Sequence, residues 1–327
     1  EAIRRLRPHA KSTHTKEVLA DIGTFGGLFH LTPRGLADPV LVASTDGVGT
    51  KLKVAVAAGV HDTIGYDLVA HCVNDILVQG AFPLFLLGYF ATGRLDPAIV
   101  EAVLSGMARA CREFGCALIG GELAEMGDLY RPGDYDIAGF IVGAVERDRL
   151  ITGETIAPGD VLIGLPSVGL HTNGYSLARR IFFGRLGLKP DSRVEELGAT
   201  VSQLLLAPHR GYLAPLRDLV DRRLLKGLAH ITGGGLTDNV PRILPEGCAA
   251  VFTRSAIRVP PIFAFMQREG RVAEDEMWRT FNMGVGMVLV AEPGNAGAIE
   301  EHLFRIGEAP SRIGVVGAGA RRVVYKD

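Results

Sequence analysis

The segment D-G-V-G-T-K at 46–51 holds the densest group of reactive side chains in this chain. It follows an apolar run at 39–43, which predicts a strand that ends in a turn. Glycine lets backbone N–H groups approach an anion, the ammonium of Lys51 can neutralise phosphate charge, and the carboxylate of Asp46 can hold a Mg²⁺ that bridges phosphate oxygens. It is not a Walker motif, because its lysine follows Gly-Thr and its glycines are too close together. The segment predicts a metal–nucleotide site, and a tight solvated turn is the alternative.

A helix predicted at 66–79 carries a second group of polar side chains. Its apolar residues recur at helical spacing and form a core face. The opposite stripe lacks Lys and Glu, the usual surface residues, and holds Asp67, His71, Asn74 and Asp75. Short polar side chains are better suited to contact with a metal or a substrate than to a purely solvated surface. We therefore favour a functional role for Asp75, and a solvated surface remains the simpler explanation for His71.

Glycine-rich turns mark three further segments where a strand ends. Gly120-Gly121-Glu122 follows a strand predicted at 116–119, and His171 lies in a glycine-flanked loop at the start of a helix. The sequence T-G-G-G at 232–235 stands between a short strand and another helix. Free backbone N–H groups at a helix start favour an anion. The segment 232–235 therefore predicts a phosphate-binding loop, and His171 is expected next to an anion.

The composition excludes several classes of protein. The formal net charge of the 327 residues is −1, which argues against a nucleic-acid-binding protein. No run of about 18 apolar residues is present, so we expect no membrane span. The four cysteines form no C-x-x-C pair, which fits reduced thiols and a cytoplasmic location. The chain is long enough for two domains of ordinary size.

Alternating strand and helix patterns predict an α/β or α+β fold with two domains. In the first half we expect helices at 66–79 and 97–114 and strands at 39–43, 84–90, 116–119 and 137–145. In the second half we expect strands at 161–165, 228–231, 285–291, 313–316 and 323–325, and helices up to 183, at 236–243 and at 296–306. A turn-rich stretch at 146–160 places the boundary near residue 150, which gives domains 1–150 and 151–327.

The motifs taken together resemble those of the phosphoribosylformylglycinamidine cyclo-ligase family, and the similarity spans essentially the whole chain. Besides the segments above, the matching motifs include H-D-T-I-G at 61–65, C-V-N-D at 72–75, H-T-N-G-Y-S-L at 171–177 and R-T-F-N-M-G-V-G-M at 279–287. The resemblance implies the fifth step of de novo purine synthesis, in which formylglycinamidine ribonucleotide and ATP give aminoimidazole ribonucleotide, ADP and phosphate. It also implies a homodimer whose N-terminal mixed sheets join across the interface, and a C-terminal domain with a sheet flanked by helices. ATP and Mg²⁺ are the implied cofactors, and K⁺ is left open.

The resemblance also directs the assignment of site residues. We expect Asp46, Asp75 and Glu122 to hold Mg²⁺. We expect the ATP phosphates to be bound by Gly47, Gly49, Thr50, Lys51, Asn74 and Asp75. His171, together with Asp46 and Lys51, is expected to be catalytic, and to polarise the formyl oxygen or transfer a proton. The ribose phosphate of the substrate is expected on Asn173, Thr232, Gly233, Gly234 and Gly235.

Other ATP-binding proteins of related architecture are the alternatives. Selenophosphate synthetase typically carries a reactive Cys in its N-terminal glycine-rich loop, and 23–27 of this chain holds none. Thiamine-monophosphate kinase and the hydrogenase maturation protein that dehydrates a carbamoyl group remain open. A nucleotide-binding scaffold without catalysis is a fourth possibility. The joint presence of Asp46, Lys51, Asp75, Glu122 and His171 argues against such a scaffold.

Overall fold

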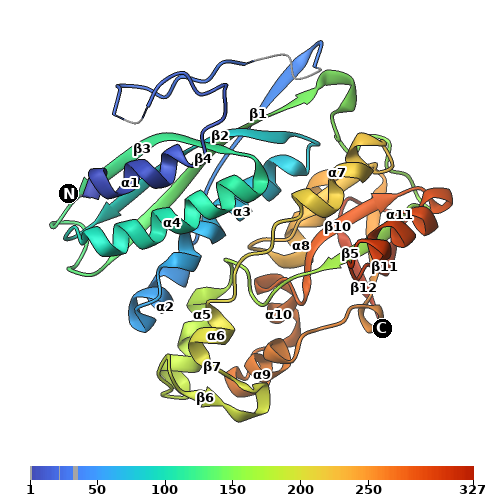
Figure 1. The fold of residues 1–327 in the computed structure, drawn as a ribbon. Coiled ribbons are helices and arrows are strands. Elements are labelled where there is room, and N and C mark those ends of the chain that lie inside the picture. Colours follow the sequence, from blue (N-terminus) through green and yellow to red (C-terminus); the bar gives the residue numbers. More distant parts are fainter. Residues whose placement is uncertain (1, 22, 32–35) are drawn as a thin grey trace. The chain divides into compact units, whose positions relative to one another are not determined.

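The computed structural model describes residues 2–21, 23–31 and 36–327, and the chain forms two compact units (Figure 1). The N-terminal unit comprises Glu1–Leu77, Ala81–Asp148 and Leu205–Gly211. The C-terminal unit comprises Val78–Gly80, Arg149–Leu204 and Tyr212–Asp327. The second long stretch of the N-terminal unit, Ala81–Asp148, ends two residues before residue 150. The short segment 205–211 was not anticipated, because it lies in the second half of the sequence.

The N-terminal unit is built on a mixed four-stranded sheet, in the order β1-β4-β2-β3. Its strands are β1 (Pro39–Gly47), β2 (Phe82–Thr92), β3 (Ala117–Glu125) and β4 (Tyr135–Glu146). The pair β2–β3 is parallel, and β4 is antiparallel to both β1 and β2. This confirms the predicted mixed sheet. The helices α3 (Asp62–Leu77) and α4 (Pro97–Phe114) cover one face of it, and α1 (Ala2–Lys11) packs beside α4 (Figure 1).

Local sequence signals explain these two helices. Asp96 accepts a hydrogen bond from the backbone N of Ala98, with Pro97 in the first turn, so Asp96 caps the N-terminus of α4. Glycines let α3 and α4 approach closely: a Cβ added to Gly65 would lie 1.9 Å from the carbonyl oxygen of Val103. α3 begins at Asp62, four residues before the predicted start. The result is a closely packed pair of helices on one face of the sheet.

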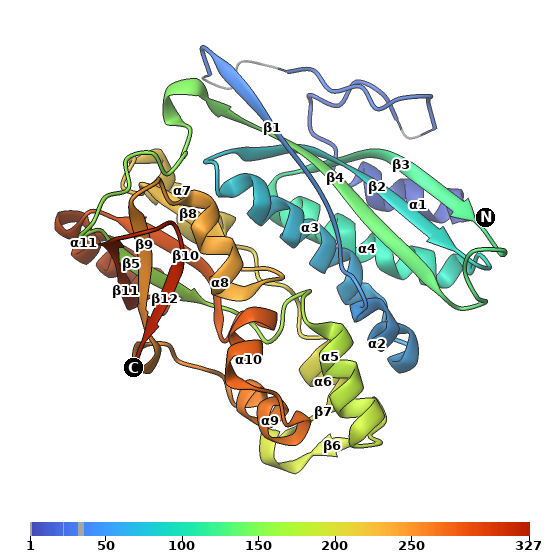
Figure 2. The same cartoon turned by 180° about the vertical axis from the view of Figure 1, so that it is seen from behind.

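No helix of the described residues covers the opposite face of this sheet (Figure 2). Apolar side chains on that face are exposed. In β4, burial alternates along the strand, and the positions that face α3 are the buried ones. Phe140 points to the other side and is 48% exposed. Leu41 of β1 is 56% exposed. An apolar face of this kind is typical of a surface that contacts another element or another chain.

The C-terminal unit contains a six-stranded sheet in the order β12-β9-β11-β5-β10-β8. The strands are β5 (Val161–Pro166), β8 (Gly227–His230), β9 (Cys248–Thr253), β10 (Val285–Ala291), β11 (Ser311–Ala318) and β12 (Val323–Lys326). The helices are α5 (Tyr175–Arg179), α6 (Val201–Leu205), α7 (Leu213–Asp221), α8 (Gly235–Asn239), α9 (Pro261–Gly270), α10 (Glu274–Thr280) and α11 (Pro293–Arg305). The short strands β6 (Arg193–Val194) and β7 (Ala199–Thr200) form an antiparallel hairpin. The predicted sheet flanked by helices is confirmed.

Several helices differ from the sequence prediction. An unpredicted helix, α2 (Lys51–Ala58), starts directly after the Asp46 turn. The helix expected up to residue 183 is α5 followed by a π-helical stretch at Arg180–Arg185. The helix expected at 236–243 is α8 followed by a 3₁₀ turn.

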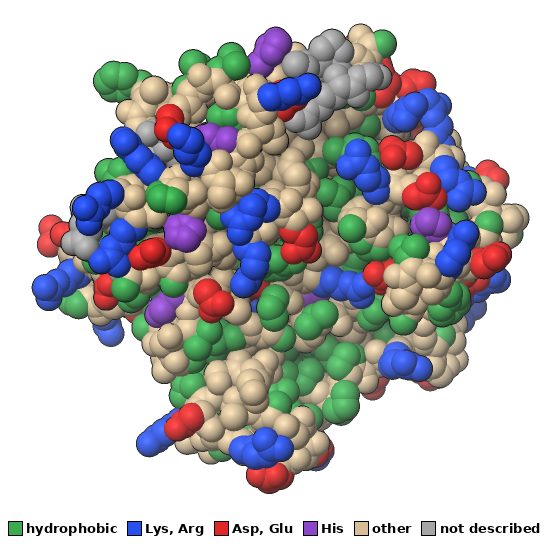
Figure 3. Space-filling model, viewed as in Figure 1, with side chains coloured by type: hydrophobic (Ala, Val, Ile, Leu, Met, Phe, Trp, Pro, Cys, Tyr) green, Lys and Arg blue, Asp and Glu red, His purple; other side chains and the backbone are tan. Residues whose placement is uncertain are grey.

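The described residues include no helix that is both long and apolar enough to span a bilayer. Positive and negative side chains alternate over the face seen in Figure 3, in line with the near-zero net charge.

Candidate functional site

Asp46 and Asp75 converge around the imidazole of His71 in the N-terminal unit. Asp46 lies near the end of β1 and faces α3, which supplies the other two residues. Nε2 of His71 is 2.8 Å from Oδ2 of Asp46 and 3.8 Å from Oδ2 of Asp75. Ser44, two residues before Asp46 on the same strand, donates a hydrogen bond to Asp75 at 3.2 Å. Two carboxylates and one imidazole therefore meet at one end of the site.

The pKa values in this cluster follow from the burial and charges of its members. Burial favours neutral His71, but the hydrogen bond to Asp46 and the charges of Asp75 and Asp46 raise its pKa overall. Burial also acts to raise the pKa of Asp46, yet His71 and the backbone N–H of Gly47 lower it overall. The two carboxylates therefore favour the imidazolium form of His71. A Mg²⁺ ion prefers oxygen ligands, so Asp46 and Asp75 are the residues that fit it here.

The glycines of the turn shape the backbone between β1 and α2. Gly49 has φ +54°, a conformation that favours glycine. A Cβ added to Gly47 would lie 3.1 Å from the carbonyl oxygen of Ile137. Thr50 directly precedes α2. The turn thus presents backbone close to Asp46, which is the arrangement that a phosphate-binding turn needs.

Lys51 lies in the interior, next to a carboxylate. Its side chain and that of Asp67 are both 0% exposed, and its Nζ is 2.7 Å from Oδ2 of Asp67. Nζ also donates a hydrogen bond to the carbonyl oxygen of Ala207 at 2.8 Å. Burial lowers the pKa of Lys51 and raises that of Asp67, while the ion pair opposes both shifts. The structure therefore places Lys51 against Asp67 and Ala207 rather than on the surface of the turn.

Asn74 and His209 form a further part of the site. Nδ2 of Asn74 donates to the carbonyl oxygen of Arg210 at 2.8 Å and lies 3.2 Å from Nε2 of His209. The rings of His209 and His71 have centroids 5.1 Å apart. Sequence reasoning missed His209, because no motif marks it and it is 135 residues from Asn74 along the chain.

Glu122 is not brought to Asp46 within one chain. It lies on β3, at the opposite edge of the sheet from β1. The register runs from Gly47 to Ala138, from Ala138 to Tyr89 and from Tyr89 to Glu122, so two strands intervene. At about 4.8 Å per strand, the backbones are roughly 14 Å apart. Glu122 accepts a hydrogen bond from the backbone N of Leu123 and is exposed.

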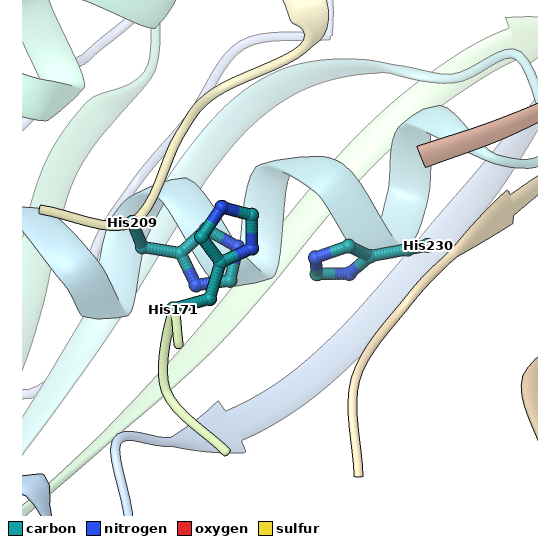
Figure 4. A group of neighbouring side chains, drawn as sticks. All are labelled: His171, His209 and His230. Atoms are coloured by element: carbon teal, nitrogen blue, oxygen red, sulfur yellow. The ribbon is translucent and has the colours of Figure 1, made fainter. Parts of the chain in front are cut away.

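In the C-terminal unit, His171 is buried in a strained loop. Its φ is +58°, which is uncommon for a residue other than glycine and is often found at functional sites. Nε2 accepts a hydrogen bond from the backbone N of Val168 at 3.1 Å, which places the proton of a neutral ring on Nδ1. A nitrogen of His230, at the end of β8, lies within 4.8 Å of one of His171 (Figure 4). The predicted His171 therefore has a second histidine as its neighbour.

The motif at 279–287 holds the His171 loop in place through Asn282. Oδ1 of Asn282 accepts hydrogen bonds from Ser167 Oγ and from the backbone N of Gly284, and Nδ2 donates to the carbonyl oxygen of Gly169. Asn282 is 3% exposed. Sequence reasoning did not assign this residue a role, although the motif that contains it was part of the resemblance.

The glycine loop and Asn173 lie together, as the predicted phosphate site requires. A Cβ added to Gly233 would be 3.3 Å from Oδ1 of Asn173. Gly234 and Gly235 have φ +95° and +59°. Asn239 holds the loop by three hydrogen bonds. Its Nδ2 donates to the carbonyl oxygens of Gly233 and Gly235, and its Oδ1 accepts from the hydroxyl of Thr232. The hydroxyl of Thr232 thus points to Asn239.

Comparison with known families accounts for nearly the whole chain. The family model "AIR synthase related protein, N-terminal domain" matches residues 34–145, and "AIR synthase related protein, C-terminal domain" matches 157–327. The phosphoribosylformylglycinamidine cyclo-ligase of Alkaliphilus metalliredigens is 49% identical over 99% of this chain and 93% of its own length. Seven further relatives of the same name are 47–52% identical.

Solved structures at lower identity share the fold. Thiamine-monophosphate kinase from Stenotrophomonas maltophilia has a TM-score of 0.72 at 17% identity, covering 100% of this chain and 96% of its own. The hydrogenase maturation protein HypE in complex with ATP has a TM-score of 0.69 at 20% identity, covering 99% and 91% of the two chains. At these identities the likeness concerns the fold alone.

Proposed function

We propose, from the premise that this chain belongs to the phosphoribosylformylglycinamidine cyclo-ligase family, that it closes the imidazole ring of aminoimidazole ribonucleotide at the expense of ATP. The observation that carries this conclusion is the identity of about half of all residues over the full chain. The Asp46–Asp75 cluster of the N-terminal unit and the His171 loop of the C-terminal unit each support it separately. The reaction belongs to purine synthesis, and we place the enzyme in the cytoplasm, where its four free, buried cysteines stay reduced.

The reaction needs activation of an amide oxygen. The formyl oxygen is a poor leaving group, so it first accepts the γ-phosphoryl group of ATP, which releases ADP. The amidine nitrogen of the same molecule then attacks the formyl carbon, the C–O bond breaks, and phosphate leaves as the ring closes. Because both groups belong to one molecule, correct orientation can supply an effective molarity on the order of 10⁵ M. The protein must therefore stabilise charge on the phosphoryl group and move protons.

We assign the Mg²⁺–ATP site to the N-terminal unit. Asp46 and Asp75 would hold the metal, since both carboxylates face the same imidazole. The backbone of Gly47, Gly49 and Thr50 would contact the ATP phosphates, whereas the amide hydrogens of Asn74 are directed at Arg210 and His209. ATP bound to a protein of the same fold is in line with this assignment. When bound, Mg²⁺ would neutralise charge on the transferring phosphoryl group.

We assign the substrate to the loops of the C-terminal unit. The segment Thr232–Gly235 with Asn173 would bind the ribose phosphate through backbone N–H groups and one amide. His171 would polarise the formyl oxygen or transfer a proton, and Val168 and Asn282 keep its loop in place.

A homodimer would account for the position of Glu122 and for the exposed apolar side chains on the helix-free face of the sheet. Phe140 and Leu41 form part of an exposed apolar face that a second copy of the chain would cover. β1 and β3 are the two edge strands of the sheet. If the sheets of two copies joined, Glu122 of one copy could approach Asp46 of the other, which a single chain cannot achieve.

One assay tests the proposal. The purified chain is incubated with formylglycinamidine ribonucleotide, ATP and Mg²⁺, with and without K⁺, and ADP and the aminoimidazole product are quantified. We expect both products in a one-to-one ratio and none when Mg²⁺ is chelated. Phosphorylation of thiamine monophosphate, with no ring closure, would instead support the kinase of similar fold.

A further inference from the structure

A buried ion pair and an amide side chain hold one short segment of the second half of the chain on the N-terminal unit. The ion pair is Lys51 of α2 with Asp67 of α3, at 2.7 Å and 0% exposure. The segment is Leu205–Gly211. It belongs to the N-terminal unit, although the residues before and after it in the sequence belong to the C-terminal unit. All the contacts described below lie within the N-terminal unit.

Each polar group of the ion pair makes a second contact with this segment. Nζ of Lys51 donates to the carbonyl oxygen of Ala207 at 2.8 Å. Oδ1 of Asp67 accepts from the backbone N of His209 at 2.6 Å. A buried ion pair gains little net stability over apolar residues of similar volume, but these extra hydrogen bonds give it a specific geometry.

Asn74 fixes the side chain at the centre of the segment. Its Nδ2 donates one hydrogen to the carbonyl oxygen of Arg210, which leaves the other directed toward Nε2 of His209 at 3.2 Å. Because an amide NH₂ group only donates, Nε2 accepts, and the proton of His209 is on Nδ1. The neutral ring then lies with its centroid 5.1 Å from that of His71.

We infer that Lys51, Asp67 and Asn74 act as a tether that holds 205–211 against the N-terminal unit and positions His209 beside His71. In this assignment Lys51 is a positioning residue and not a ligand of the ATP phosphates. The inference does not rest on the proposed reaction, because every contact is made by the chain alone.

Hydrogen exchange tests the tether without any substrate. In Asp67→Asn, the His209 amide loses its charged acceptor, so we expect its exchange to become at least about tenfold faster. In Lys51→Met, the carbonyl oxygen of Ala207 loses the ammonium donor, and Asp67 is left buried without its cation. We expect the melting temperature to fall by about 5–10 °C in both variants. The control is Lys53→Met, two residues on in α2, whose partner Asp134 is at the surface. It should change neither quantity.

The double variant Lys51→Met/Asp67→Leu separates the tether from a simple stabilising pair. Removing both charges should restore most of the melting temperature, whereas protection of the His209 amide should stay low because its acceptor is gone. Unchanged protection in Asp67→Asn and in the double variant would overturn the inference. Should Asp67→Asn fail to fold, Asn74→Leu supplies the second test, with faster exchange over 207–210 expected and unchanged exchange contradicting the tether.

ATP binding then distinguishes the two roles of Lys51. Titration with Mg²⁺ and a non-hydrolysable ATP analogue should give the double variant a Kd within about threefold of the unaltered chain, since no phosphate contact is lost. If Lys51 were instead a ligand of the ATP phosphates, the affinity for the analogue should fall tenfold or more, whether or not Asp67 is present. That result would refute the positioning role of Lys51 even if the exchange data supported the tether. An inactive but tethered enzyme would count against the proposed reaction only.

Discussion

Nε2 of His71 lies 2.8 Å from Oδ2 of Asp46, so the imidazole contacts one of the two carboxylates that we propose as Mg²⁺ ligands. The same nitrogen is 3.8 Å from Asp75. The imidazolium form of His71, which these carboxylates favour, would supply positive charge at the position proposed for Mg²⁺. We therefore expect the protonation of His71 and the binding of Mg²⁺ to compete.

We expect Mg²⁺ binding to release protons from His71. Its pKa is raised by Asp46 and Asp75 despite burial, and a divalent cation at those carboxylates would lower it again. Calorimetric titration with Mg²⁺ in buffers of different ionisation enthalpy measures the release. At pH 6.5 we expect a fraction of one proton per ion, and none in His71→Asn. Equal proton release by both proteins would contradict the competition.

The same pair predicts a dependence of stability on pH. The pKa of His71 is raised on folding, so its contribution is fully present below the unfolded value of about 6.5 and is lost as pH rises through the folded value. The pKa of Asp46 is lowered, so its contribution is lost as pH falls through the folded value of that group. His71→Asn should cost about 1–2 kcal/mol between these limits and less above them, because the Asp46 side chain is partly exposed. Chemical unfolding from pH 4 to pH 9 without Mg²⁺ measures this difference, and a constant difference over that range would contradict it.

Replacing His171 should abolish most of the turnover. General acid–base catalysis by one histidine typically contributes about 10²–10⁴-fold to kcat. The informative variant is His171→Asn, because asparagine tolerates the positive φ at this position better than alanine does. We expect kcat to fall by at least about 100-fold with the melting temperature changed by only a few degrees. Turnover near that of the unaltered enzyme would refute the role of His171.

Asn173 and the glycine loop should determine substrate affinity. Asn173→Ala removes the amide that lies next to Gly233, so we expect KM for the ribonucleotide to rise about tenfold while KM for ATP stays the same. Steady-state kinetics with each substrate varied in turn separates the two constants. An equal rise in KM for ATP would place the amide in the nucleotide site instead.

A charge on the helix-free face of the sheet should disrupt the proposed homodimer. Phe140→Glu puts a carboxylate at the centre of the apolar face, and burying it in an interface would be costly. Light scattering on a sizing column should show monomers for this variant. The matched control is Leu129→Glu, because Leu129 is 76% exposed in the loop between β3 and β4. An unaltered mass for Phe140→Glu would show that this face is not the interface.

The sequence predicted the elements that carry the site better than the directions of individual side chains. The apolar run before Asp46 and the periodic face of α3 are local signals, and both correspond to elements of the structure. The direction of the Lys51 side chain was not predicted from the local sequence. Because α2 begins at this residue, Lys51 shares a buried face with Val54 and Ala55 at helical spacing. That i, i+3, i+4 spacing was visible in the sequence, but no helix was predicted there.

Long-range relationships were beyond a reading of the sequence. The separation of Glu122 from Asp46 follows from the strand order, in which β4 and β2 lie between β1 and β3. No local pattern specifies that order. His209 reaches His71 only because a segment from the second half of the chain packs on α3. Such contacts depend on chain topology, which periodicity and turn chemistry do not encode.

Because Leu205–Gly211 belongs to the N-terminal unit, the two halves of the sequence depend on each other in recombination between homologous genes. A chimera of two homologous genes joined near codon 150 would take Lys51 and Asp67 from one parent. It would take the segment 205–211, which these two residues contact, from the other parent. The two halves of the sequence are therefore not freely interchangeable. We expect functional chimeras to take the Lys51–Asp67 pair and the segment 205–211 from the same parent.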